Sequence, residues 1–226
     1  MKSKKPSAST IAKFSMLFAI IIVLQIISNY IKVGPVNVTL TLIPLVLGGI
    51  MLGVKGGTLL GFAFGLTTLI YGLIGIDGGF VMTLMSGGPF NVILTILICL
   101  VKGTMAGFIS ALLFKVISKK NVVIALIVSA LSAPIVNTGL FILGALGLNN
   151  VIGGMASANG VSTIYFLVIY CAGFNFLFEF GTTLVFAPSL TRVIKALGVK
   201  TAEQVEEKSD SQSPEQTEEE NDASCD

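Results

Sequence analysis

The sequence is almost empty of acidic residues over its first 200 positions, and it has neither histidine nor tryptophan. Between Met1 and Lys200 the only acids are Asp77 and Glu179, and residues 121–178 hold no Asp, Glu, Lys or Arg. A water-soluble domain needs charged groups to solvate its exterior and to prevent association. The chain is therefore predicted to use the lipid bilayer as its solvent.

The missing residue types also exclude most catalytic chemistry. Without histidine, and with Glu179 as the one carboxylate inside an apolar segment, neither a metal site nor a Ser/His dyad can be built. The chain has no Gly-x-x-x-x-Gly-Lys-Ser/Thr sequence, which excludes a Walker-type nucleotide site. Its three cysteines lack disulfide or metal-ligand spacing and are read as small packing residues. We expect no enzyme activity, no metal ion and no resident cofactor.

Apolar residues make up 54% of the chain, in long blocks separated by Gly, Pro, Asn or Lys. Such blocks predict helices that can cross a bilayer. The predicted fold class is an all-α integral membrane protein, a six-transmembrane-helix bundle. The second block is short for a span, and Pro44 is expected to tilt or break it. The six predicted helices cover residues 11–31, 40–54, 56–75, 91–117, 121–147 and 163–196.

The basic residues predict the orientation of this bundle. Of the 14 Lys and Arg residues, all but Lys32 and Lys102 lie before or at the start of the first helix, at or beyond the end of the sixth, between helices two and three, or at the connection of helices four and five. Positive residues flank spans on the cytoplasmic side, so both termini are predicted to be cytoplasmic. The outer connections are then residues 32–39, 76–89 and 148–162, of which the last two are rich in glycine. Such connections are either lids over a site or ordinary flexible links.

The chain divides into three predicted parts. Residues 1–10 form a cytoplasmic N-terminus, residues 11–200 form the membrane domain, and residues 201–226 form a disordered acidic cytoplasmic tail. This tail holds the other ten of the 12 acids and has little apolar surface to bury. The acids offset a basic membrane body, and nothing in this balance indicates a nucleic-acid partner.

Glycines recur every four residues in two places. This spacing removes side chains from one stripe of a helix and allows two helix backbones to approach closely. Because Lys55 is expected to mark a turn, the first series is predicted to form two short ladders rather than one. The glycines concerned are Gly49, Gly53, Gly57, Gly61 and Gly65, followed by Gly103 and Gly107.

Lys102 and Glu179 are the ionisable groups inside apolar segments, where charges are costly and usually functional. Lys102 lies ~16 Å below Asn91 along the fourth helix, and these two residues share a face with Thr95. Glu179 shares a face of the sixth helix with Asn175, and the fifth helix contributes Ser129 and Asn137 on loosely the same side. The candidate substrate-binding residues are Asn91, Lys102, Asn137, Asn175 and Glu179.

Three interpretations of Lys102 and Glu179 remain open. In the first, both project into a polar cavity that holds a small polar solute. In the second, they form an ion or proton relay in a stand-alone secondary carrier or channel. In the third, they pair with each other and only fasten two helices together.

Two stretches resemble a known family. TLTLIPLVLGGIMLGVKGGTLLGFAFGL, which includes Leu40 and Leu66, and SAPIVNTGLF, from Ser132 to Phe141, resemble the substrate-binding (S) component of energy-coupling factor (ECF) vitamin transporters. The resemblance covers about residues 10–200. It implies a six-helix protein that captures a water-soluble vitamin outside a bacterial plasma membrane. Delivery inward would require a transmembrane T protein and two ATPase subunits.

The resemblance also implies sites. Family members dock to the T protein through small residues on the first helix, which here correspond to Ala12, Ser15 and Ala19. The five candidate binding residues match the family's substrate region by position. The block from Leu40 to Gly65 is most like the same block of pantothenate-type members.

The aromatic residues bear on the choice of vitamin. Tyr30, Tyr71 and Tyr165 are explained by an aromatic belt at the membrane interface. Flat vitamins are often held by stacking, yet no Trp and no Tyr except Tyr170 is expected at the depth of Lys102. A non-aromatic acid such as pantothenate is therefore favoured, with riboflavin and other vitamins as alternatives.

Overall fold

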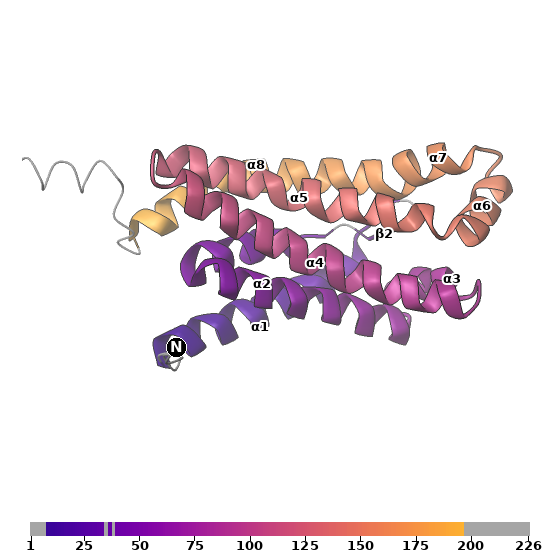
Figure 1. The fold of residues 1–226 in the computed structure, drawn as a ribbon, viewed down its shortest axis with the longest axis horizontal. Coiled ribbons are helices and arrows are strands. Elements are labelled where there is room, and N and C mark those ends of the chain that lie inside the picture. Colours follow the sequence, from indigo (N-terminus) through magenta and orange to yellow (C-terminus); the bar gives the residue numbers. More distant parts are fainter. Residues whose placement is uncertain (1–7, 34–35, 38, 197–226) are drawn as a thin grey trace, which may run out of the picture.

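The computed structural model describes residues 8–33, 36–37 and 39–196. Within this part, five helical segments are long and apolar enough to cross a membrane, so the chain is a multi-pass membrane protein. They run roughly along the long axis of the molecule (Figure 1). The segments are α1 (Ala8–Tyr30), α2 (Leu42–Ile74), α4 (Pro89–Ile117), α5 (Val122–Leu146) and Thr163–Phe186, which belongs to the last helical rod.

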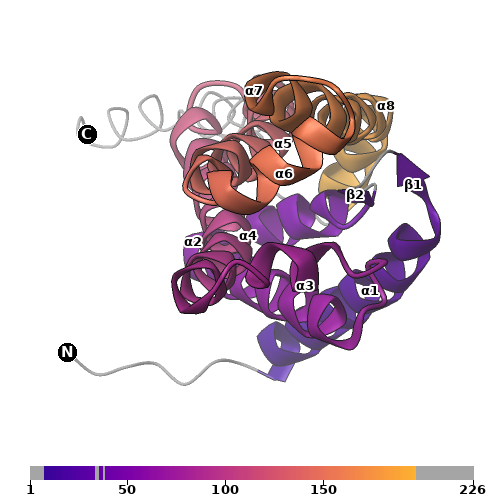
Figure 2. The ribbon, with the colours of Figure 1, turned by 90° about the vertical axis from the view of Figure 1, so that its right-hand side faces the viewer.

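The two ends of the bundle differ. The start of α1, the connection between α4 and α5, and the far end of α8 (Phe174–Ala196) lie at one end, on the left of Figure 1. Two short helices, α3 (Phe80–Met85) and α6 (Asn149–Ala158), lie at the opposite end, which faces the viewer in Figure 2. The core consists of two large apolar clusters. One joins α1, α2, α4 and α5, and the other joins α3, α4, α5 and α6 to the last rod.

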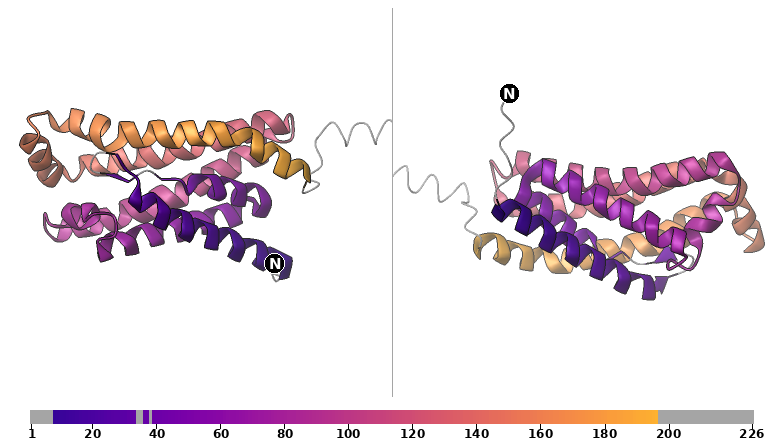
Figure 3. Two further views of the ribbon diagram at one scale, coloured as in Figure 1. Left: turned by 180° about the vertical axis from the view of Figure 1, so that it is seen from behind. Right: turned by 90° about the horizontal axis from the view of Figure 1, so that it is seen from below.

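The second and third predicted helices form one element, α2, that bends back on itself at Gly53. Gly53 has φ 72° and ψ −173°, a backbone conformation that glycine adopts without steric cost. A Cβ atom on Gly57 would lie 2.9 Å from the Cα of Gly49, whereas residues eight apart in a straight helix are ~12 Å apart. The two arms of α2 therefore run antiparallel, as Figure 3 shows.

This bend affects two of the sequence predictions. The six-span count is not confirmed, because the arm of α2 before Gly53 is too short to cross a bilayer alone and five segments meet the length of a span. The expected break at Pro44 is wrong. Pro44 is buried in the first turn of α2, where a missing N–H leaves no helical hydrogen bond unmade.

The predicted close packing of glycines is confirmed at the contact between the second arm of α2 and α4. A Cβ atom on Gly57 would lie 2.8 Å from the carbonyl oxygen of Gly107, and one on Gly103 would lie 2.6 Å from that of Gly61. These distances leave no room for side chains. The predicted turn is at Gly53 rather than at Lys55, so Gly57, Gly61 and Gly65 form one ladder in the second arm while the first arm keeps only Gly49.

The three predicted outer connections contain short regular elements. Residues 32–39 include an antiparallel pair of two-residue strands, β1 (Lys32–Val33) and β2 (Val36–Asn37). The other two connections contain α3 and α6. Asp77 lies just before α3 and stabilises its start, because its Oδ1 accepts from the Gly79 N–H at 2.8 Å and its Oδ2 from the Val81 N–H at 2.8 Å.

The last rod consists of α7 (Thr163–Tyr165), a π-helical segment η1 (Phe166–Gly173) and α8. In η1 a Cβ atom on Gly173 would lie 2.8 Å from the carbonyl oxygen of Val168. A larger residue at position 173 would therefore crowd this wide turn, whereas glycine does not. Such π-helical turns are often found at functional sites. The predicted tail, residues 201–226, lies outside the described residues.

Candidate functional site

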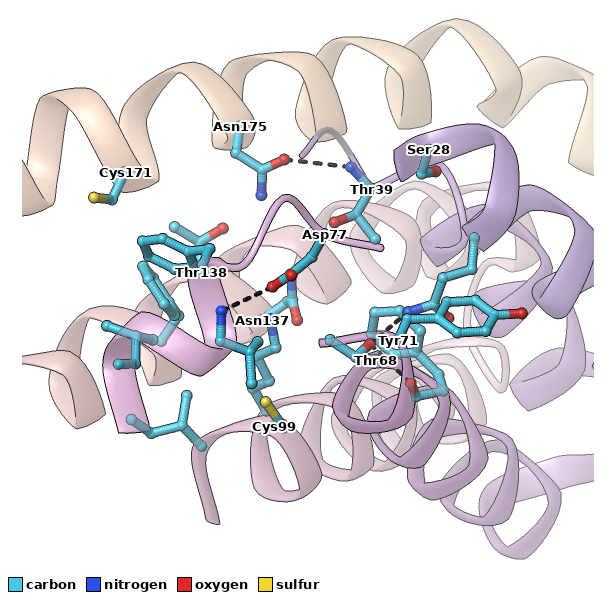
Figure 4. Close-up of a pocket in the computed structure, with 18 of the residues that line it drawn as sticks. Ser28, Thr39, Thr68, Tyr71, Asp77, Cys99, Asn137, Thr138, Cys171 and Asn175 are labelled. Atoms are coloured by element: carbon cyan, nitrogen blue, oxygen red, sulfur yellow. Dashed lines mark hydrogen bonds between the residues drawn. The ribbon is translucent and has the colours of Figure 1, made fainter. Parts of the chain in front are cut away.

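A cavity of about 110 Å³ lies in the half of the bundle that contains α3, between the two core clusters. Its walls come from α1, α2, α3, α4, α5, η1 and α8, together with Thr39 and Asp77 from the connections (Figure 4). Phenylalanine and aliphatic side chains cover part of the wall. The polar and thiol residues on it are Gln25, Ser28, Asn29, Thr39, Thr68, Tyr71, Asp77, Thr95, Cys99, Lys102, Asn137, Thr138, Cys171 and Asn175.

Lys102 lines this cavity and has no carboxylate partner there. Its Nζ atom lies 5.6 Å from the centre of the Phe141 ring, a cation–π arrangement. In the described part of the chain no salt bridge joins Lys102 to Glu179 or to Asp77. The interpretation that Lys102 and Glu179 only fasten two helices together therefore finds no support in the contacts.

Glu179 is fully buried and lies beside the cavity, held by amide groups. Asn175 Nδ2 donates to Glu179 Oε1 at 2.8 Å, and Asn137 Nδ2 donates to both carboxylate oxygens at 3.3 and 3.4 Å. Asn175 Oδ1 in turn accepts from the Thr39 N–H at 3.3 Å, as Figure 4 shows. The network thus connects α5 and α8 to the segment that precedes α2.

Three buried polar atoms on the cavity wall have no hydrogen-bond partner: Thr95 Oγ1, Asn137 Oδ1 and Thr138 Oγ1. Leaving such an atom unpaired costs roughly 1–3 kcal/mol. A polar molecule in the cavity would pair with these atoms and remove that cost. These side chains also suit a polar ligand, because Lys102 supplies a charge while the hydroxyl and amide groups form directional hydrogen bonds that fix the ligand's orientation.

Of the five predicted binding residues, the structure brings four together. Lys102, Asn137 and Asn175 line the cavity, and Glu179 supports the two asparagines from behind. Asn91 does not line it. Its Nδ2 donates to the Leu84 carbonyl at 3.1 Å and to Asn150 Oδ1 at 3.1 Å, and Asn150 Nδ2 donates back at 3.3 Å. Asn91 thus ties the start of α4 to α3 and α6.

Ser129 is also outside the cavity. Its hydroxyl donates to the Ser110 carbonyl at 2.7 Å and so joins α5 to α4.

Sequence reasoning missed a second polar cluster on the wall, centred on Gln25 of α1. Gln25 Nε2 donates to Thr68 Oγ1 at 2.6 Å, and Thr67 Oγ1 donates to Gln25 Oε1 at 2.8 Å. Ser28, one turn further along α1, accepts from the Leu40 N–H at 3.1 Å. The sequence did contain a signal for this cluster, because Gln25 is an amide residue within an apolar predicted span.

The aromatic residues of the wall also differ from the sequence prediction. Tyr71 lines the cavity together with Phe64, Phe80 and Phe141. Tyr170, the expected exception, does not line it; its ring stacks on Phe166 with the ring centres 5.7 Å apart. The absence of stacking groups therefore no longer argues against an aromatic ligand.

A family model described as "ECF transporter, substrate-specific component" matches residues 9–191. No curated protein and no solved structure matches the chain.

Proposed function

Because the chain belongs to the family of ECF transporter substrate-specific components, which bind substrate for transport and are not enzymes, we propose that it captures a water-soluble vitamin for an ECF-type importer. A transmembrane T protein and two ATPase subunits would complete the importer. The single observation that carries the proposal is the cavity, in which Lys102 forms no salt bridge and three buried polar atoms have no hydrogen-bond partner.

The proposed location is the bacterial plasma membrane, with both described ends of the chain toward the cytoplasm. Lys13 near the start of α1, Lys55 after the bend of α2, and Lys115 in the last turn of α4 all belong to the end of the bundle away from α3 and α6. The positive-inside rule supports a cytoplasmic position for that end. The cavity then lies in the outer half of the membrane.

Pantothenate is the proposed substrate. Its carboxylate would pair with Lys102, since a carboxylate forms a strong charge-assisted hydrogen bond with an ammonium group. Its hydroxyl and amide groups would pair with the threonine and asparagine atoms on the wall. Tyr71 and Phe141 could instead stack on a flat ring, so riboflavin is the comparison ligand in the tests.

Two natural cysteines provide a direct test of capture. Cys99 and Cys171 are buried on the cavity wall, and Figure 4 shows them on different helices. In Cys225→Ser variants that keep only one of them, saturating pantothenate should slow alkylation by N-ethylmaleimide at least tenfold. At 100 times the dissociation constant, only about 1% of the sites stay empty. The rate is followed by mass spectrometry of the purified protein in nanodiscs.

A Leu143→Cys reporter serves as the control, because Leu143 is 68% exposed on the outside of α5 and its alkylation should not respond to the vitamin. Protection by riboflavin but not by pantothenate would contradict pantothenate as the substrate and would still support vitamin capture. Protection by no member of a panel of water-soluble vitamins would contradict vitamin capture itself.

The first helix is the proposed docking surface for the T protein. Ala12, Ser15 and Ala19 are exposed on α1, and their spacing of three and four places them on one face. Small residues there would let a partner helix approach closely. Ser15→Leu and Ala19→Leu are each expected to reduce copurification of the T protein and ATPases at least tenfold. Protection of Cys99 by vitamin should not change.

The matched control is Ile20→Leu, which changes a residue that is 36% exposed on the same helix but about 80° or more from each of these three residues around its axis. It should copurify as the unmodified chain does. Equal copurification by all three variants would show that docking uses another surface.

A further inference from the structure

We infer that Glu179 does not touch the substrate but fixes the orientation of the Asn137 amide, so that the cavity presents a hydrogen-bond acceptor. The inference rests on the proposed function and narrows its substrate class. A ligand must then carry a hydroxyl or N–H donor opposite Asn137, in addition to the anionic group that faces Lys102.

Asn137 and Asn175 are on the wall, whereas Glu179 is not and has no exposed surface. Asn137 Nδ2 lies within 3.4 Å of both carboxylate oxygens. Glu179 therefore sits behind the asparagines and reaches the cavity only through them.

The carboxyl group of Glu179 fixes the polarity of the two amides, because both of its oxygens accept from Asn137 Nδ2 and Oε1 also accepts from Asn175 Nδ2. The NH₂ group of Asn137 must therefore face Glu179. The amide is planar, so its oxygen is left on the other side.

Asn137 Oδ1 is buried and has no partner. The neighbouring Thr95 and Thr138 hydroxyls can donate or accept as a ligand requires, and the Lys102 ammonium can only donate. Of these four groups Asn137 is the one that imposes an acceptor, and a ligand without a donor there would leave this buried oxygen unpaired, which lowers affinity strongly.

Glu179→Gln provides the test because it keeps the shape of the side chain and adds a donor. The NH₂ group of Asn137 then loses its charged acceptor and no longer has one preferred orientation. Binding of pantothenate, measured by calorimetry, should weaken about tenfold. Asn137→Asp combined with Glu179→Gln should recover most of this loss, since an aspartate presents an acceptor in either orientation and also accepts from the new amide at position 179.

The control is Thr182→Val, one turn along α8, where the hydroxyl only bonds to backbone carbonyls of its own helix; binding should not change. If Glu179 were purely structural, or if it touched the ligand, the double variant would not recover pantothenate affinity. Absence of recovery would overturn the inference.

A spectroscopic arm separates this inference from the proposed function. In chain labelled with ¹³C,¹⁵N-asparagine and without ligand, Glu179→Gln should move the side-chain NH₂ signals of Asn137, which are assigned with Asn137→Ser. Pantothenate, or whichever vitamin protects Cys99, should then shift the Asn137 carboxamide carbon more than its NH₂ group. If no vitamin binds, the proposed function fails while the ligand-free comparison still decides the inference. Unchanged NH₂ signals would contradict it.

Discussion

Replacing Lys102 with methionine should weaken vitamin binding about 100-fold while leaving the protein folded. Methionine keeps the length of the side chain and its contact with Phe141, so the packing of the cavity wall changes little. The loss comes from the ammonium group, since a hydrogen bond to a charged group contributes about 1.5–3 kcal/mol and the bound carboxylate would be left without a counter-charge. Calorimetry of the purified variants with pantothenate measures the change.

Lys115→Met is the matched control, because Lys115 lies on the same helix but in its exposed last turn. It removes the same charge from the chain at a site far from the cavity, and binding should not change. Retained affinity in the Lys102 variant would mean that the ligand is not an acid held by this lysine. The alternative of a stand-alone carrier predicts, in contrast, gradient-driven uptake into liposomes by this chain alone.

The polar part of the site was predictable where polar residues interrupt long apolar helices. Lys102 and Asn137 are visible in that way, because a membrane span gives an isolated amide or charge no reason to be there other than a partner or a cavity. Thr39 and Asp77 were not, because both come from connections whose position depends on how the helices pack. Their place on the wall follows from the tertiary arrangement and not from any local pattern.

The helices themselves were predictable from apolar runs, and their interruptions were less so. The reversal in α2 rests on a single backbone conformation at Gly53, and glycines in the same series form straight helix. Helices α3 and α6 were predicted as loops because they are short and lie in glycine-rich connections. Local hydrogen bonds, such as those that the Asp77 carboxylate accepts from backbone N–H groups at the start of α3, stabilise helices that apolar periodicity does not indicate.

The contact between α2 and α4 decides whether this cavity keeps its shape, and Gly61→Ala is the sharpest probe of it. A Cβ atom at position 61 would lie 3.0 Å from the carbonyl carbon of Gly103 and 3.1 Å from the Cα of Thr104. Both are backbone atoms, so the two helices must move apart. Overpacking of this kind costs about 1–3 kcal/mol. Because Gly103 follows Lys102 directly, the shift also displaces the lysine, and vitamin binding should weaken together with thermal stability.

Gly139→Ala separates this effect from the ordinary consequence of adding a methyl group. Gly139 lies inside α5, and a Cβ atom there would meet nothing within 4 Å. Alanine is a better helix former than glycine by about 1 kcal/mol, so this variant should be as stable as the unmodified chain or more so. Thermal unfolding in detergent, followed by circular dichroism, compares the two substitutions. Equal stability of both variants would show that the glycine ladder does not bring α2 and α4 together, and the cavity would then owe its shape to the amide network around Glu179 instead.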